Sequence, residues 1–303
     1  MPRRVGVPSR GGQASLDGLA VVDKPTGWTS HDVVAKARGL LGTPRIGHSG
    51  TLDPGATGVL VLGVGRVTRL LKYLSGLPKR YTGELVLGVT TSTLDAGGEV
   101  TGTYDMGSVG LDDLRRAAAT LTGDISQVPP MVSAKKQRGR RLYELARAGV
   151  EVERAAVRVH VGSLTVGEPV EPGVYPIDVS CSAGTYVRSL VADLGAALGG
   201  GAHLRALRRL AVGPFGIDEA VPLDRLAPEA LLPPVEAMRG RPRIAVDDGT
   251  AAAVRHGRVL PAEAVGATGE GPWAVVDARG ALLAVYERHR GGTVKPGVVL
   301  APG

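Results

Sequence analysis

The residues best suited to chemistry lie in one short segment, GHSGTLDPGATG at residues 47–58. Its twelve residues hold a single carboxylate, Asp53, one imidazole, His48, four glycines and a proline. Glycine and proline shape the backbone, so they can bring a loop close to a substrate and hold one carboxylate at a fixed angle. The alternative is an elaborate turn without chemistry.

A second candidate segment is GTYVRSL at residues 184–190, where an expected strand passes into an expected helix. It places Tyr186 and Arg188 two positions apart. A guanidinium beside a buried carboxylate orients it and lowers its pKa, so Arg188 is the candidate partner of Asp53. The competing interpretation is a tyrosine at a strand end followed by a surface arginine.

The charge of the chain favours a polyanionic partner. Its formal net charge is +7, which is compatible with nucleic acid binding as well as with ordinary solubility. The densest cationic stretch, here called the basic arm, contains Lys135, Lys136, Arg138, Arg140 and Arg141. It is either a solvated loop or a set of contacts to RNA phosphates. A second cluster consists of Arg205, Arg208 and Arg209.

Other classes of protein fit poorly. The single cysteine, Cys181, lies in an expected strand, which indicates a buried, inert thiol in a reducing cytosol and a cytoplasmic protein. No spaced His/Cys cluster suggests a metal site. The sequence Gly63–Val64–Gly65 lacks the third glycine of a dinucleotide site. No apolar run reaches the ~20 residues of a membrane span, and residues 1–15 resemble a disordered basic tail.

Apolar spacing predicts elements that alternate irregularly, which favours an α+β fold with a mixed, mainly antiparallel sheet. The expected strands cover 18–25, 58–65, a segment from Tyr81, 157–166 and 175–181. The expected helices cover about 32–41, with Ser30 as its cap, 111–121 and 187–198. Prolines between Pro222 and Pro242 indicate a linker, and short β-like pieces after it, with a turn at DARG, predict a small β-rich C-terminal domain.

Four motifs in order resemble one known family. GHSGTLDPGATG, with DKPTGWTS before it and KRY and GTYVRSL after it, is similar to the TruB family of bacterial tRNA pseudouridine synthases, over about residues 18–213. The resemblance implies isomerisation of uridine at position 55 in the tRNA T loop, without cofactor or metal, by a monomer. It also implies a pseudouridine synthase domain at 16–235, with a thumb-like insertion at about 125–153, and a PUA-like RNA-binding domain at 243–303.

The same resemblance assigns roles to individual residues. Asp53 matches the catalytic aspartate, and the basic arm matches the thumb that grips the T loop. The substrate-binding residues are His48 against the T loop, Tyr81 stacked on the target base, Tyr186 and Arg188 beside it, Leu207 in the uracil pocket, and Lys24 and Pro25 at the pocket rim. One departure concerns TTSTLDAGG, where Ser92 stands at a position that is often Asp in the family and only Asp95 matches.

The reaction explains why these residue types are needed. The C1′–N1 bond must break and C1′ must join C5, so the base leaves its stack at a cost of a few kcal/mol. Stacking on Tyr81 recovers roughly 1–3 kcal/mol. Asp53 acts as a nucleophile or as a base at the sugar, and both roles stay open. The alternative functions are a synthase for another RNA uridine, and a tRNA-binding or tRNA-folding protein with incidental catalysis. A pure binder has no use for a carboxylate beside phosphates.

Overall fold

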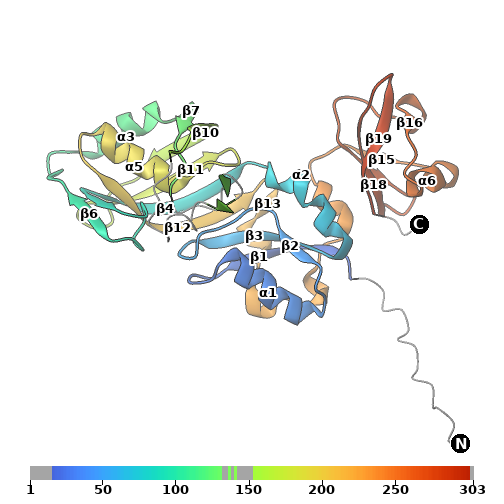
Figure 1. The fold of residues 1–303 in the computed structure, drawn as a ribbon, viewed down its shortest axis with the longest axis horizontal. Helices are drawn as coiled ribbons and strands as arrows, with labels where there is room; N and C mark the ends of the chain where they lie inside the picture. The colour runs from blue at the N-terminus through green and yellow to red at the C-terminus, as the bar shows by residue number, and fades with distance from the viewer. Residues whose placement is uncertain (1–15, 132–135, 138–139, 142–152, 301–303) are drawn as a thin grey trace, which may run out of the picture.

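The computed structural model describes residues 16–131, 136–137, 140–141 and 153–300. Figure 1 shows a larger body, which carries α1, α3 and α5, and a smaller C-terminal body that stands to one side of it. The larger body is built on a ten-stranded sheet and the smaller on a five-stranded sheet. The chain is therefore α+β with a β-rich C-terminal domain, as expected.

The large sheet runs in the order β14-β1-β3-β12-β4-β11-β10-β7, and β13 and β2 pair with β12 and β3. Only β1 with β14 and β12 with β3 are parallel pairs, so the sheet is mixed and mainly antiparallel. Its strands are β1 (Gly18–Lys24), β2 (Ile46–His48), β3 (Thr57–Val64), β4 (Lys79–Leu87), β7 (Gly123–Gln127), β10 (Val157–Val166), β11 (Val174–Cys181), β12 (Ala202–Val212), β13 (Phe215–Gly216) and β14 (Val221–Pro222).

Strand β3 is buried on both faces, which explains its unbroken apolar sequence. Leu60 and Leu62 pack on one side with helix α1 (Ser30–Leu41). Val59 and Val61 pack on the other side in the cluster that includes helix α2 (Leu71–Ser75) and the preceding 3₁₀ turn, η1 (Gly65–Leu70). The Asp53 loop connects β2 to β3, so its end is fixed by a strand at the centre of the fold.

Helix α1 begins two residues earlier than expected. Thr29, not Ser30, is its N-cap and forms a capping box with Asp32. The hydroxyl of Ser30 is instead turned toward the Asp53 loop, where it accepts a hydrogen bond from the backbone N–H of Leu52 at 2.9 Å and donates to its carbonyl oxygen at 3.2 Å. Gly42, in the left-handed conformation, ends the helix as expected.

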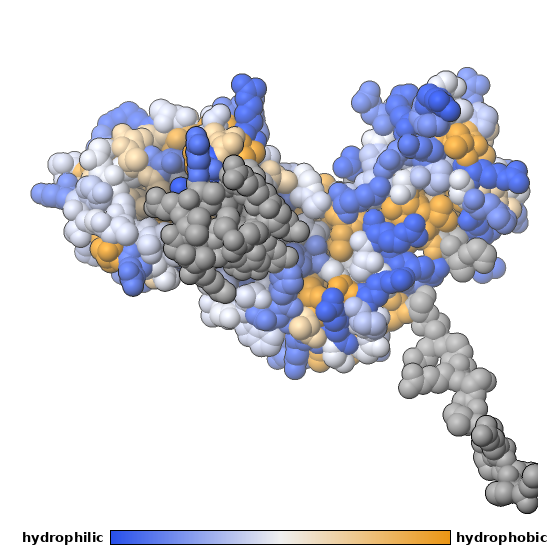
Figure 2. Space-filling model, viewed as in Figure 1, coloured by the Kyte–Doolittle hydropathy of each residue, from blue (hydrophilic) through white to orange (hydrophobic). Residues whose placement is uncertain are grey.

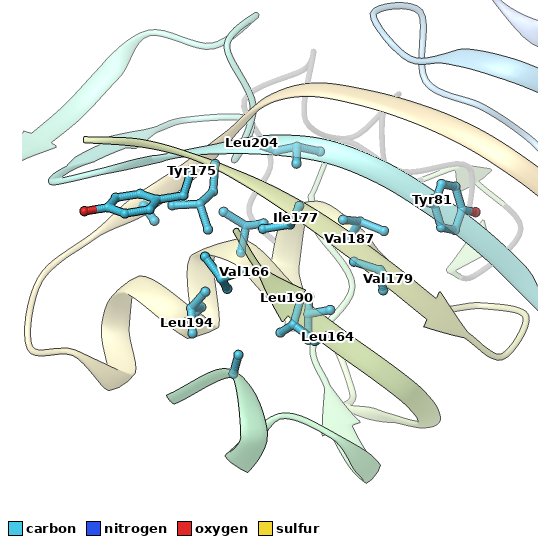
Figure 3. Packing of buried hydrophobic residues seen from close by; sticks show 14 of the residues in the cluster. Tyr81, Leu164, Val166, Tyr175, Ile177, Val179, Val187, Leu190, Leu194 and Leu204 are labelled. Atoms are coloured by element: carbon cyan, nitrogen blue, oxygen red, sulfur yellow. The ribbon is translucent and has the colours of Figure 1, made fainter. Parts of the chain in front are cut away.

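The other half of the sheet is covered by helices α3 (Leu111–Thr120) and α5 (Val187–Ala197). Leu190 and Leu194 of α5 pack with Ile177 and Val179 of β11, as Figure 3 shows. Tyr81 lies at the edge of this cluster, apart from most of its aliphatic members. Cys181 is buried, and burial raises the pKa of its thiol, in agreement with an inert cysteine.

The C-terminal domain places its five strands in the order β15-β17-β18-β19-β16. Its hairpin turn at Asp277 is confirmed, because the carboxylate accepts hydrogen bonds from the backbone N–H groups of Arg279 and Ala281. The sequence analysis did not predict the helix of this domain, α6. The elements are β15 (Arg243–Ala245), α6 (Asp248–Arg255), β16 (Leu260–Pro261), η6 (Glu263–Val265), β17 (Trp273–Val276), β18 (Leu282–Arg288) and β19 (Thr293–Val299).

The proline-rich segment 222–242 is not a linker, which corrects the sequence-based interpretation. It forms 3₁₀ turns that pack against the larger body, and Leu232 pairs through its backbone with Leu19 of β1. Val235 and Met238 are buried in the cluster that joins the two bodies. The turns are η2 (Ile217–Glu219), just before the segment, η3 (Leu223–Arg225), η4 (Pro228–Ala230) and η5 (Pro234–Met238). Figure 2 shows apolar residues gathered where the bodies meet.

Two further strand pairs form separate two-stranded sheets. One is β5 (Val89–Thr91) with β6 (Val100–Thr103), and the other is β8 (Lys136–Gln137) with β9 (Arg140–Arg141), within the predicted thumb. Lys135 and Arg138 of the basic arm, like the predicted basic tail at 1–15, lie outside the described residues. Within the described part of the chain, no helix has the length and apolar character that crossing a membrane requires.

Candidate active site

Five segments enclose a cavity of about 270 Å³ in the larger body. They are the Asp53 loop, the end of α2 with Ser75, the start of β4 with Tyr81, the junction of β11 and α5, and β12 with Leu207. A second cavity of about 300 Å³ lies against the segment that contains Asp95. Asp53, Arg188 and Leu207 line both cavities, so the carboxylate stands where the two spaces adjoin.

Asp53 and Arg188 form an ion pair, with 2.9 Å between Arg188 Nε and Asp53 Oδ2. Arg188 lies in the first turn of α5 and is only 4% exposed. Its Nη1 donates to the carbonyl oxygen of Thr93 at 2.9 Å and lies 3.5 Å from Asp95 Oδ2. One rigid guanidinium thus fixes the Asp53 carboxylate against a second carboxylate and a backbone oxygen.

Burial raises the pKa of Asp53 above its ordinary value, and the nearby Asp95 carboxylate raises it further. Arg188 and Lys24 lower the pKa, but burial outweighs them. Arg188 therefore lowers the pKa of Asp53, as expected from the sequence, but the net shift of this pKa is upward. The side chain is still 40% exposed, because one side faces the open cavity where a substrate would bind.

Lys24 holds the Asp53 loop from beneath. Its ammonium donates to the carbonyl oxygens of Pro25 at 2.9 Å, Trp28 at 2.6 Å and Pro54 at 3.1 Å. The side chain is fully buried, and burial lowers the pKa of Lys24 to about 8. Lys24 is thus not on the rim of the Asp53 cavity. Together with Pro25, it lines a separate groove.

Arg209 is a second buried cation under the same loop, and it is 2% exposed. It donates to the carbonyl oxygens of Val59 at 2.7 Å, Thr51 at 3.3 Å and Gly50 at 3.1 Å. The sequence analysis grouped Arg209 with Arg205 and Arg208 in one cationic cluster, but of these three arginines Arg209 is the buried one. The loop has many carbonyl groups that no strand can satisfy, and buried polar groups need partners. That demand signals a buried donor beneath the loop, although only the fold shows that Arg209 supplies it.

The other arginines of that cluster form ion pairs at the surface. Arg208 makes a bidentate pair with Asp23, at 3.1 and 2.7 Å. Arg205 makes a bidentate pair with Glu171, at 2.9 and 3.1 Å. Each of these two guanidinium groups is therefore already paired with a protein carboxylate.

The predicted base-contacting residues lie around the cavity. Tyr81 is buried in its wall, and burial raises the pKa of its hydroxyl. Tyr186 caps the start of α5. Its backbone N–H donates to Gln127 Oε1 at 2.7 Å, and its carbonyl accepts from Gln127 Nε2 at 3.0 Å. Gln127 was not anticipated, although it fixes the segment that presents Tyr186 and Arg188.

His48 lies at the end of β2, beside the cavity. Its ring meets the ring of His31 edge-on, with 5.5 Å between centroids, and its Nδ1 accepts a hydrogen bond from the N–H of Gly50 at 3.4 Å. The residue is partly exposed. It therefore sits at the surface next to the Asp53 loop, and it does not line the cavity.

The segment that departs from the family pattern also has a defined structure. Ser92 accepts a hydrogen bond from the N–H of Glu99 at 3.1 Å, which helps close a turn. Asp95 accepts hydrogen bonds from Thr93 Oγ1 at 2.5 Å and from the N–H of Gly97 at 3.0 Å, besides facing Arg188. Asp95 is the acidic residue of this segment that reaches the site, although the sequence analysis did not include it among the site residues.

Comparison with known proteins supports one family throughout. The family model for the N-terminal domain of TruB family pseudouridylate synthases matches residues 38–187. The models "tRNA pseudouridylate synthase B C-terminal domain" and "tRNA Pseudouridine synthase II, C terminal" match residues 188–235 and 242–301. Together the three models cover most of the chain.

Among curated proteins, the chain is 49% identical to tRNA pseudouridine synthase B of Streptomyces coelicolor over 91% of this chain and 94% of that protein. It is 48% identical to the Nocardia farcinica protein of the same name, over 95% and 94% of the two chains. A solved Cbf5-Nop10-Gar1 complex contains a chain with a TM-score of 0.72 and 27% identity, covering 94% of this chain and 85% of that one. The chain belongs to the TruB family of pseudouridylate synthases.

Proposed function

We propose that this protein isomerises uridine to pseudouridine at position 55 in the T loop of tRNA, with Asp53 as its catalytic residue. The observation that carries the proposal is the Asp53–Arg188 pair at a cavity that Tyr81 and Leu207 also line. The relatives named above are tRNA pseudouridine synthases B. A further similar structure, with a TM-score of 0.71 and 25% identity, is an H/ACA RNP bound to a substrate RNA containing 2′-deoxyuridine.

The target base enters the cavity after leaving its stack, and the Tyr81 ring replaces part of the lost stacking. The C1′–N1 bond then breaks, the uracil turns, and C1′ bonds to C5. C5 loses its proton and N1 gains one, so the product is an isomer. Asp53 serves this sequence as a nucleophile at the ribose or the uracil, or as the base that removes a proton at C2′.

Arg188 orients Asp53 for either role. Arg188 is buried and also contacts Thr93 and Asp95, so its guanidinium keeps its position when a substrate binds. Asp53 therefore meets the sugar in one orientation, which is the condition for an efficient intramolecular step. The raised pKa of Asp53 makes it a stronger base than an exposed aspartate.

The T stem-loop is the proposed RNA partner, held by the basic arm and by the C-terminal domain, in a cytoplasmic, monomeric enzyme. The net charge of +7 supports a polyanionic partner. An RNA-binding or folding protein with incidental catalysis is the competing function. The buried machinery that supports Asp53 favours catalysis, since a binder gains nothing from a carboxylate held beside phosphates.

The direct test incubates purified protein with an unmodified T-arm transcript and maps pseudouridine by chemical adduct formation and primer extension. We expect one modified site, in the T loop. A transcript with cytidine at that position is the matched control. Modification at a different uridine would favour the synthase with another target, and binding without any product would favour the RNA-binding alternative.

A further inference from the structure

Helix α2 lies between the C-terminal domain and the Asp53 cavity. Figure 1 shows it at the end of the larger body that faces the smaller one. It is only five residues long, and Gly76, Leu77 and Pro78 connect it to the first residue of β4, Lys79. Only these three residues separate α2 from the strand that carries Tyr81.

On one side, α2 is bonded to the C-terminal domain. The hydroxyl of Tyr73 donates to Glu287 Oε1 at 2.6 Å, and Lys72 Nζ lies 3.4 Å from the same oxygen. Leu74 is buried in the cluster that includes apolar residues of β17, β18 and β19. The fit at this contact is tight, because a Cβ added to Gly297 would lie 2.3 Å from Tyr73 Oη.

On the other side, α2 forms part of the cavity. Ser75 lines it, and so does Lys79. The ammonium of Lys79 donates to the carbonyl oxygens of Ser75 and Leu77, both at 2.7 Å. Lys79 is 7% exposed, and it precedes Tyr81 on the same face of β4. The carbonyl groups at the end of α2 thus hold the wall beside the stacking tyrosine.

We infer that the C-terminal domain positions this wall through α2, so that its docking on Tyr73 controls turnover, in addition to the RNA binding proposed for the domain itself. The inference rests on the proposed function. It makes Tyr73 and Glu287 positioning residues for the reaction, although neither lines the cavity. A domain that only bound RNA would influence affinity and leave the saturated rate unchanged.

The test uses Gly297→Ala, which places a methyl group against Tyr73 and Glu287 and needs no unusual backbone. Gly249→Ala in α6 of the same domain is the matched control, because its Cβ would meet its nearest neighbour, Asp247 Oδ1, at an ordinary 3.4 Å. Both are assayed on a T-arm hairpin, with kcat and KM measured separately. Wild-type turnover of this hairpin tests the proposed function independently of the variants.

We expect Gly297→Ala to lower kcat by about tenfold with little change in KM, since a 1 Å misplacement can cost up to about 10²-fold. Gly249→Ala should match wild type. Tyr73→Phe, which removes one hydrogen bond without a clash, should lower kcat by about threefold and decides the matter if Gly297→Ala fails to fold. An unchanged kcat in a folded Gly297→Ala or in Tyr73→Phe would overturn the inference.

Discussion

Replacing Asp53 by asparagine should lower the activity of the protein and raise its stability. Asparagine keeps the shape of the side chain but has neither charge nor basicity. If Asp53 acts as a base, turnover falls by about 10²–10⁴-fold, and if it acts as a nucleophile, product disappears. RNA affinity should stay close to that of wild type, because the basic arm and Tyr81 are unchanged.

The stability change follows from the sign of the pKa shift. The pKa of Asp53 is raised above its unfolded value of 3.8, so the folded protein disfavours the ionised form. Above the folded pKa, wild type therefore carries a cost that Asp53→Asn lacks, and the variant should be more stable at pH 7.5. Because the side chain is 40% exposed, solvent screens the effect, and the gain should be at most about 1 kcal/mol, or roughly 2–4 °C in Tm. The advantage should shrink as the pH falls toward 3.8.

Thermal unfolding at pH 7.5, 6 and 4.5 measures this difference, together with single-turnover assays and RNA titrations. Asp193→Asn is the matched control, because burial also raises the pKa of Asp193, and this residue does not line the cavity. It should keep full activity. Product formation at the wild-type rate by Asp53→Asn, with deamidation excluded, would refute the assignment. A variant less stable than wild type at pH 7.5 would refute the sign of the electrostatic argument.

Four further predictions concern the scaffold and the RNA contacts. Gly58→Ala should lower the free energy of unfolding by about 3 kcal/mol or more, because its φ is +100° and a Cβ would lie 2.2 Å from Arg209 O. Gly39→Ala, with open space within α1, should raise it by about 0.5–1 kcal/mol, and both values come from urea titration. Removing residues 243–303 should cause aggregation, visible by size-exclusion chromatography, because the cut exposes the cluster shared by the two bodies; a monomeric, stable product would contradict this. Replacing Lys136, Arg138 and Arg141 of the basic arm by alanine should reduce the slope of log affinity against log salt concentration by about two units if each cation contacts one phosphate. Parallel plots for the variant and wild type would show that the basic arm does not contact the phosphates.

Local signals predicted the elements that have strong periodicity or clear end signals. The strand at β3 and the helices α1 and α5 were expected within a few residues, because their apolar spacing reflects what they pack against. Strand β12 was missed, although it pairs with both β3 and β4. Its arginines interrupt the apolar pattern, and its register shifts near Leu204 and Arg209, so no simple alternation survives.

Some residues of the candidate site were likewise predictable from local sequence, and others were not. Asp53 and Arg188 stand in segments with special composition, and the structure brings them together as expected. The roles of Lys24 and Arg209 were not predictable, since each bonds to backbone carbonyl groups that only the folded loop presents. The raised pKa of Asp53 depends on burial by distant segments, and no local pattern reports that.

The two buried cations under the Asp53 loop limit how far its motif can be moved between proteins. The loop keeps its shape because Lys24 of β1 and Arg209 of β12 bind its carbonyl groups from separate strands. A graft of residues 47–58 onto another scaffold would carry the aspartate but not these donors. For the same reason, a search for distant enzymes with this loop should require a buried lysine and a buried arginine at these places as well as the aspartate.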